Sequence, residues 1–189
     1  VTVPANSALA IEKGVMVGGK SDGSLVINGR LLLEGATSSD IVFQAESGAD
    51  AADGSWTGIT LETGSKAMLK GFTLRGAGGP IPGFPGTKTG LRVKIPVTIE
   101  HALIEKNRNV GVWLDGPSTI RNIVFRNHTQ GLAGAQALFI NNTSVTFDTA
   151  TFSGNTTGIY ASGGQATATS TGPVIFEGNT TNTDPANLF

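Results

Sequence analysis

Residues 111–127 read GVWLDGPSTIRNIVFRN, which is one complete unit of a pattern that recurs along the chain. A glycine opens the unit, and the short alternating strand Val112-Trp113-Leu114 follows it. A second apolar motif closes the unit, with Ile120, Ile123 and Phe125 ahead of an asparagine. Five such glycines occur, at steps of 32, 21, 20 and 27 residues: Gly58, Gly90, Gly111, Gly131 and Gly158. Units of this length are typical of a solenoid, whose coils stack on one another and share a core.

The second motif has the spacing apolar-x-x-apolar-x-apolar in four units. It occurs at Leu69/Phe72/Leu74, Ile99/Ala102/Ile104, Ile120/Ile123/Phe125 and Phe147/Ala150/Phe152. The two-residue gap shifts the phase of the alternation, which a straight strand cannot do without turning its apolar face outward. We therefore predict a bend in each gap, with both flanking strands directed inward. Like residues of successive coils should then stack about 4.8 Å apart.

The first third of the chain alternates apolar and polar residues in short bursts separated by glycine-rich turns. The bursts are Leu9/Ile11, Val15/Val17, Leu25/Ile27, Leu31/Leu33 and Ile41/Phe43. In each pair one outward residue separates two inward residues, which is the two-residue period of a half-buried strand. The Asn28-Gly29 turn would normally favour a hairpin. The bursts are too short for a hairpin sheet, so we predict successive corners of a coil.

Composition favours a single β-rich domain over residues 1–189. Charged residues make up 14% of the chain, against about a quarter on average, and there are 27 glycines and no cysteine. The formal net charge is −1 without any run of lysine or arginine, which argues against nucleic acid as a partner. No apolar stretch approaches the ~20 residues that span a bilayer, so no membrane span is expected. Because the chain begins at Val1 rather than methionine, we expect a fragment of a longer surface protein.

Two features resemble a known family. Ile120–Asn127 has the form Ile-x-Asn-x-x-Phe-x-Asn, and several asparagines precede a Gly-Ile, Gly-Val or Gly-Leu pair with two or three residues in between. In both features the chain resembles the right-handed parallel β-helix repeat family, the pectate-lyase-like group of secreted and bacterial cell-surface proteins. The resemblance implies an all-β, single-stranded right-handed parallel β-helix of about seven or eight coils. It also implies an extracellular or cell-surface location.

The family further implies a ladder of turn asparagines, in which each amide bonds to the next coil. The candidates are Asn107, Asn127, Asn155 and Asn179, with His128 placed beside Asn127 by the spacing. Ordinary turn asparagines with left-handed backbone would give the same pattern. Both interpretations are structural and neither predicts chemistry.

Catalytic members of the family carry aspartates at these turns as acid and base. Asn182-Thr183-Asp184 is similar to one of their motifs, but the matching earlier turns contain no acid. The remaining candidate acids fall at different coil positions: Asp50, Asp53, Asp115 and Asp148. His101 and His128 are isolated. We therefore expect a structural or adhesive module with no catalytic residue, metal or cofactor. The alternative, a polysaccharide lyase or glycoside hydrolase, requires carboxylates that converge in one groove.

The outward residues of the glycine-led strands predict a column along one face: Thr60, Arg92, Trp113, Ala133 and Tyr160. Glu62, Lys94 and Asp115 lie just beyond this column. Aromatic rings beside charged groups can stack on sugar rings and bond their hydroxyls. We therefore predict that a polysaccharide or cell-surface glycan binds here, at Thr60, Arg92, Lys94, Trp113, Asp115 and Tyr160.

Two insertions, residues 76–89 and 133–143, interrupt the repeat near this face, and Phe84 would form a wall beside the site. The second insertion contains the possible strand Leu138-Phe139-Ile140. The opposing interpretation is that the insertions cover Trp113 and Tyr160 as local packing. Loops on one face of a solenoid often build its binding surface, so both interpretations stay open.

A second alternative function, ice binding, comes from the row Thr167, Thr169 and Thr171. Earlier coils are expected to carry Lys, Arg and Glu at the matching outward positions, which argues against a regular array. Five Asn-x-Ser/Thr sequons follow from turn asparagines in a threonine-rich chain and do not indicate glycosylation. The end segments Val1–Ala8 and Asn187–Phe189 are weak caps, so flanking domains or a second subunit are expected at the solenoid ends.

Overall fold

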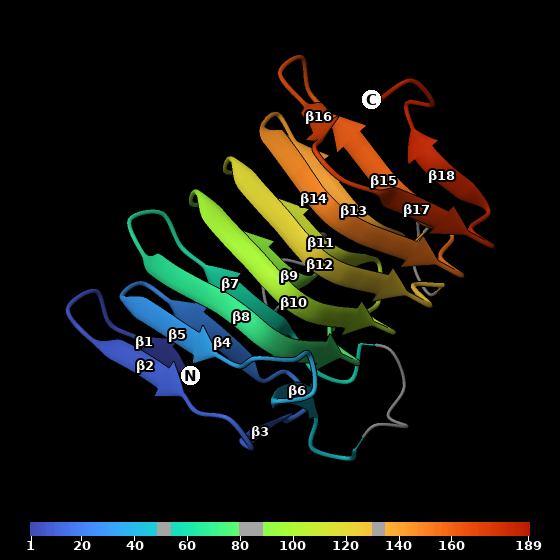
Figure 1. The fold of residues 1–189 in the computed structure, drawn as a ribbon. Helices are drawn as coiled ribbons and strands as arrows, with labels where there is room; N and C mark the ends of the chain where they lie inside the picture. The colour runs from blue at the N-terminus through green and yellow to red at the C-terminus, as the bar shows by residue number, and fades with distance from the viewer. Residues whose placement is uncertain (49–53, 80–88, 130–134) are drawn as a thin grey trace.

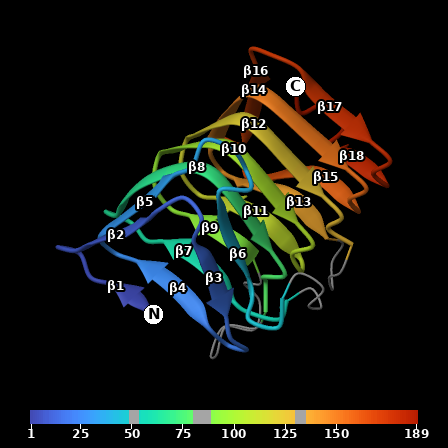
Figure 2. The same cartoon turned by 60° about the horizontal axis from the view of Figure 1, so that its bottom comes forward.

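A computed structural model describes residues 1–48, 54–79, 89–129 and 135–189. Within these residues the protein is all-β, without a helix, and its strands form two parallel sheets. The chain advances steadily along the stack, so the two termini lie at opposite ends (Figures 1 and 2). This arrangement is compatible with a solenoid in which each strand pairs with its counterpart one unit later.

Sheet A contains, in both sequence and spatial order, β1 (Thr2–Val3), β4 (Ser24–Ile27), β7 (Gly58–Leu61), β9 (Thr89–Val93), β11 (Val110–Leu114), β13 (Gln136–Asn141), β15 (Thr157–Ser162) and β18 (Thr181–Asp184). Sheet B contains β2 (Ala8–Ile11), β3 (Met16–Gly19), β5 (Arg30–Glu34), β6 (Ile41–Ala45), β8 (Lys66–Arg75), β10 (Val97–Glu105), β12 (Ser118–Arg126), β14 (Ser144–Ser153), β16 (Thr167–Ser170) and β17 (Val174–Glu177).

The register of sheet A aligns inward apolar residues along the stack. Five residues on consecutive strands are paired in this way and are fully buried: Ile27, Leu61, Val93, Leu114 and Ile140. A one-residue slip would turn these side chains toward solvent. Burial of this apolar column therefore fixes the outward residues between them.

The predicted bends are confirmed in three long strands of sheet B. The second residue of each two-residue gap has left-handed backbone, with φ of 70° at Gly71 and 50° at His101 and Asn122. On either side of the bend in β10, Ile99 and Ala102 are both buried. One strand therefore lines two sides of the core. The short strands of the first third also form where the bursts predicted them, from β2 to β6.

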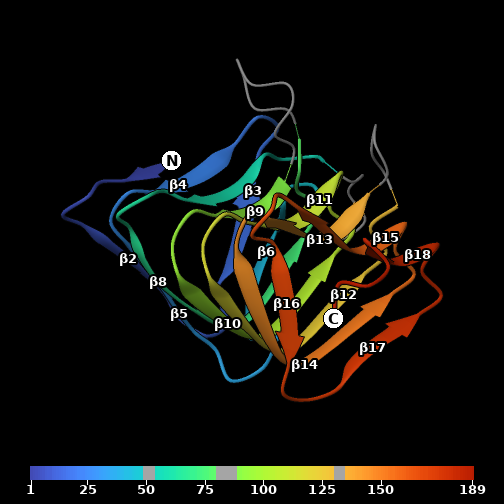
Figure 3. The ribbon, with the colours of Figure 1, turned by 90° about the horizontal axis from the view of Figure 1, so that it is seen from above.

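Phenylalanines form the predicted stack of like residues near the C-terminal end. The rings of Phe125 and Phe152 are parallel within 2°, with centroids 4.7 Å apart, and Phe176 stacks on Phe152 at 5.2 Å. Seen from above, the strands of both sheets surround this interior (Figure 3). The stack follows from the parallel register, which places Phe125 opposite Phe152 and Phe152 opposite Phe176.

The possible strand at Leu138-Phe139-Ile140 in the second insertion is confirmed. It extends over Gln136–Asn141 as strand β13 of sheet A, which pairs with β11 and β15. Leu138 and Ile140 of this strand enter the core. The strand expected to begin at Gly131 lies outside the described residues.

The two ends of the stack differ. At the N-terminal end an apolar hollow of about 750 Å³ is lined by residues that include Leu9, Val17, Leu25 and Trp56. At the C-terminal end Leu188 packs against the core, and the ring of Phe189 lies 5.8 Å from that of Phe147. The tail thus contacts the last coils, whereas the first coils leave apolar surface open.

Candidate functional site

A buried ladder of polar side chains fixes the corner between the two sheets. Asn107 Oδ1 accepts a hydrogen bond from the backbone of Ala77 at 2.9 Å. Asn155 Oδ1 accepts from the backbone of His128 at 3.1 Å, and Asn179 Oδ1 accepts from that of Asn155 at 2.9 Å. His128 completes the series, because its Nδ1 accepts from the backbone N–H of Asn107 at 3.3 Å. Asn107, Asn155 and Asn179 stand two or three residues before β11, β15 and β18, so the ladder fixes the approach to these strands.

The prediction that Asn127 belongs to the ladder is wrong. Asn127 is exposed, with φ of 58°, whereas the neighbouring His128 is completely buried. The other members each follow the last inward apolar residue of a sheet B strand by three positions, and His128 stands three after Phe125. Burial lowers the pKa of His128 to about 3. Its Nε2 has no hydrogen-bond partner within the part of the chain that the structure describes.

An outward row of large side chains crosses sheet A. Thr60, Arg92, Trp113, Phe139 and Tyr160 are paired in register on β7, β9, β11, β13 and β15. We call the four residues from Arg92 to Tyr160 the aromatic row. The fourth position of the column was expected at Ala133, which lies outside the described residues. Phe139 occupies that position, because β13 supplies the strand between β11 and β15.

The members of the aromatic row contact one another. The Cζ of Arg92 lies 4.9 Å from the ring centroid of Trp113. Phe139 meets Trp113 edge-on, with centroids 4.3 Å apart, and its centroid lies 5.3 Å from that of Tyr160. All four side chains are half-buried. Trp113 therefore uses part of its surface in packing between Arg92 and Phe139, and Tyr160 ends the run of rings.

Asp115 anchors one edge of the aromatic row. Its Oδ2 accepts from Arg92 Nε at 2.9 Å, and its Oδ1 accepts from Trp113 Nε1 at 2.9 Å and from Asn141 Nδ2 at 2.6 Å. Burial alone would raise the pKa of Asp115, but these three donors hold it below its ordinary value. The carboxylate is therefore ionised at neutral pH and ties three strands together.

A second ion pair lies beside the first. Lys94 Nζ donates to Glu62 Oε2 at 2.7 Å. The structure thus brings six of the predicted site residues to one face: Thr60, Arg92, Lys94, Trp113, Asp115 and Tyr160. Phe84 lies outside the described residues. Sequence reasoning missed Phe139 and Asn141, although the alternating run from 138 to 140 already indicated a strand.

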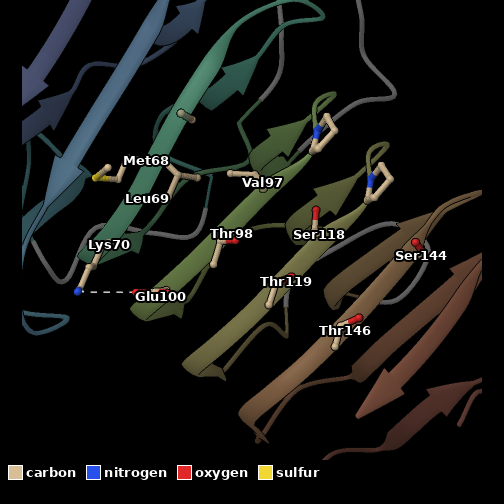
Figure 4. Close-up of a pocket in the computed structure, with 13 residues that line it drawn as sticks. Met68, Leu69, Lys70, Val97, Thr98, Glu100, Ser118, Thr119, Ser144 and Thr146 are labelled. Atoms are coloured by element: carbon tan, nitrogen blue, oxygen red, sulfur yellow. Dashed lines mark ion pairs between the residues drawn. The ribbon is translucent and has the colours of Figure 1, made fainter. Parts of the chain in front are cut away.

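Sheet B carries a shallow groove of about 720 Å³ on its outer surface. Met68, Thr98, Thr119 and Thr146 lie side by side along it, one on each of β8, β10, β12 and β14 (Figure 4). Thr169 continues the column on β16. The earlier strands therefore carry threonine or Met68 at the positions that match Thr169.

The charged residues instead form a parallel column two positions along. Glu100 pairs with Lys70 at 3.8 Å (Figure 4). On its other side Glu100 pairs with Arg121 at 3.0 Å. Glu100 is the one acid among the described residues that line the groove. In the described part of the chain, no group of three or more His, Cys, Asp or Glu side chains is arranged to hold a metal ion.

Comparison of the chain with protein-family models, with curated proteins and with solved structures finds no match. Among the described residues, no helix is long and apolar enough to cross a membrane. The function must therefore be argued from the geometry of the two faces.

Proposed function

We propose that the chain is a non-catalytic extracellular or cell-surface module, built on a right-handed parallel β-helix of about seven or eight coils. Its role is structural or adhesive, and the aromatic row binds a polysaccharide or cell-surface glycan. The observation that carries the proposal is the register of Arg92, Trp113, Phe139 and Tyr160 on four adjacent strands, all half-buried.

The chemistry of this face suits sugar rings. Aromatic side chains present apolar surface with polar groups at their edges, which is the combination that a pyranose ring and its hydroxyls need. Asp115 and Asn141 stand along one edge of the row and are already held in fixed positions by hydrogen bonds. Rigid groups lose little conformational entropy on binding, which favours affinity.

Asp184, the acid of the motif that is similar to a catalytic one, is not placed to act with Asp115 in glycosidic cleavage. Asp184 pairs with Tyr160 on the neighbouring strand, whereas Asp115 follows β11, three strands away. Three strand spacings amount to about 14 Å, and glycosidases place their two carboxyl groups about 5–9.5 Å apart. In the groove of sheet B, Glu100 is engaged by Lys70 and Arg121.

The open N-terminal end of the stack supports a flanking domain or a second subunit as a partner. Flanking domains or a second subunit would cover the apolar hollow at Leu9, Val17 and Leu25. Burying such surface is favourable by roughly 25 cal/mol per Å². Pairing the free edges of the first strands would also satisfy their backbone groups.

A glycan array tests the proposal. The purified protein would be screened beside a Trp113→Ala/Tyr160→Ala double variant and a Thr119→Ala control on the opposite sheet, each checked by circular dichroism. We expect binding by the native protein and the control and loss of binding by the double variant. Binding that survives in the double variant places the site elsewhere, and absence of all binding leaves a spacer or assembly module.

One observation favours ice binding as a second candidate. Thr98, Thr119, Thr146 and Thr169 form an unbroken column on sheet B, and the hydroxyls of Thr146 and Thr169 lie 3.3 Å apart. The column is single and borders charged residues. Thermal hysteresis of the native protein, compared with a Thr119→Lys variant, distinguishes this function, since a glycan-binding module would show none.

A further inference from the structure

Both cations of the candidate glycan face are already paired with carboxylates. Arg92 and Asp115 form an ion pair at 2.9 Å, with their side chains 25% and 19% exposed. Lys94 and Glu62 form another at 2.7 Å, with 28% and 31% exposure. Partial burial weakens solvent screening of such pairs. An incoming anion would have to displace a carboxylate that is covalently part of the sheet.

Two contacts also fix the orientation of the Arg92 side chain. Its Nε donates to Asp115, while its guanidinium lies over the Trp113 ring. Asp115 itself is held by Trp113 and Asn141. A swing of Arg92 toward an anionic ligand would break an ion pair and a cation–π contact together. The network thus holds Arg92 in its present orientation.

The local charge count also disfavours anions. Counted over the described residues, the aromatic row and its edge carry two cations, Arg92 and Lys94, and two carboxylates, Glu62 and Asp115. Asp184 adds a third carboxylate, exposed and in register with Tyr160. A surface with excess negative charge slows the approach of polyanions and weakens their binding.

We infer that the aromatic row selects uncharged glycans over uronic-acid or sulfated ones. The inference rests on the proposed function and names its ligand class. Neutral sugars need apolar contact and hydrogen bonds, which the rings, Asp115 and Asn141 supply. Acidic glycans need free cations, and the ion pairs with Asp115 and Glu62 withhold them.

The test compares binding of a neutral polymer, a polyuronate and a sulfated polysaccharide by the native protein at low and physiological salt. We expect retention on the neutral polymer with little salt dependence and at least a tenfold weaker interaction with both acidic polymers. Asp115→Asn and Glu62→Gln each release one cation. Each variant should gain binding to the acidic polymers at low salt, about tenfold, and lose that gain as salt rises.

Glu177→Gln is the matched control, because it removes the same charge at an exposed position of β17 in sheet B where the described residues show no ion pair, and it should leave all three affinities unchanged. Glu62→Gln serves if Asp115→Asn does not fold. A native protein that prefers the acidic polymers overturns the inference but leaves glycan binding standing. Folded variants that gain no acidic binding overturn it as well. Failure of the native protein to bind any of a broad set of glycans removes the proposed function and the inference together.

Discussion

The imidazole of His128 fills the space that a side chain at Gly111 would need. A Cβ on Gly111 would collide with His128 Nε2 and lie 2.5 Å from the carbonyl oxygen of Ala137. Gly90 has the same relationship to Asn107, whose side-chain amide carbon would lie 3.0 Å from the added Cβ. The glycine that leads one strand and the ladder residue of the next coil are therefore two halves of a single packing arrangement.

Gly111→Ala should destabilise the protein by about 1–3 kcal/mol or more, because neither a buried imidazole nor a strand carbonyl can move aside freely. Urea unfolding measures the change in the free energy of unfolding. Gly164→Ala is the control, since a Cβ there meets nothing within 4 Å. Equal stability of the two variants would show that the contact between Gly111 and His128 is not tight in solution.

The stability of the protein should rise with pH between about 3 and 6.5. The folded state keeps His128 neutral, with a pKa of about 3, while the unfolded chain binds a proton below its ordinary value of 6.5. Because the unfolded state then holds more protons, the free energy of unfolding falls as pH is lowered through this window, by at most about 1.4 kcal/mol per pH unit. Denaturant midpoints measured across this range give the slope.

His128→Asn should flatten that slope. The amides of Asn107 and Asn155 each donate to a carbonyl of the preceding coil, that of Leu74 and that of Phe125. An asparagine at 128 should make the equivalent bond and carries no titrating group. His101→Asn is the control, because His101 lies half-exposed at a bend with φ of 50° that asparagine accepts. If the pH dependence of the free energy of unfolding is unchanged in His128→Asn, its assignment to His128 is wrong.

Glu105→Gln should cost about 1–3 kcal/mol of stability. Glu105 is 5% exposed and pairs with Arg75 at 3.5 Å and with Arg126 at 2.8 Å. The change leaves both arginines without their carboxylate. Glu100→Gln on the same strand should cost less than about 1 kcal/mol, because Glu100 is 24% exposed and its ion pairs are screened. Thermal unfolding of the two variants at equal salt provides the comparison.

Asn122→Val should destabilise the protein by about 1–2 kcal/mol, because φ of 50° is unfavourable for a residue with a branched Cβ. Asn122 is exposed, so packing contributes little. Asn122→Gly should stay within about 0.5 kcal/mol of the native protein. A valine variant as stable as the glycine variant would mean that the bend can relax.

The periodic features of the fold could be predicted from sequence because they follow from burial. Apolar residues two apart indicated the strands, and the gap before Phe72 or Ala102 indicated the bends. The column of Arg92, Trp113 and Tyr160 followed from the same alternation. These inferences need only the pleat of a strand and the exclusion of water from one face.

Other features could not be predicted from local patterns, because they depend on which segment of the chain forms a given strand of sheet A. Gly131 matched the pattern locally, yet Gln136–Asn141 supplies the strand of sheet A and brings Phe139 and Asn141 to the face. The spacing placed His128 beside Asn127, but asparagine was expected as the ladder residue because of its type. Counting three positions from Phe125 selects His128. The ion pairs of Arg92 and Lys94 cross between coils and have no local signature.

Each of β9, β11, β13 and β15 contributes one side chain to the aromatic row, so the length of the row is set by the number of strands. Duplication or loss of one coil would lengthen or shorten the row by about 4.8 Å while leaving its cross-section unchanged. Such a surface can be matched to a longer or shorter polymer in fixed increments, without redesign of any single contact. Size and specificity are then adjustable separately, the first by the number of coils and the second by the residue that each coil presents.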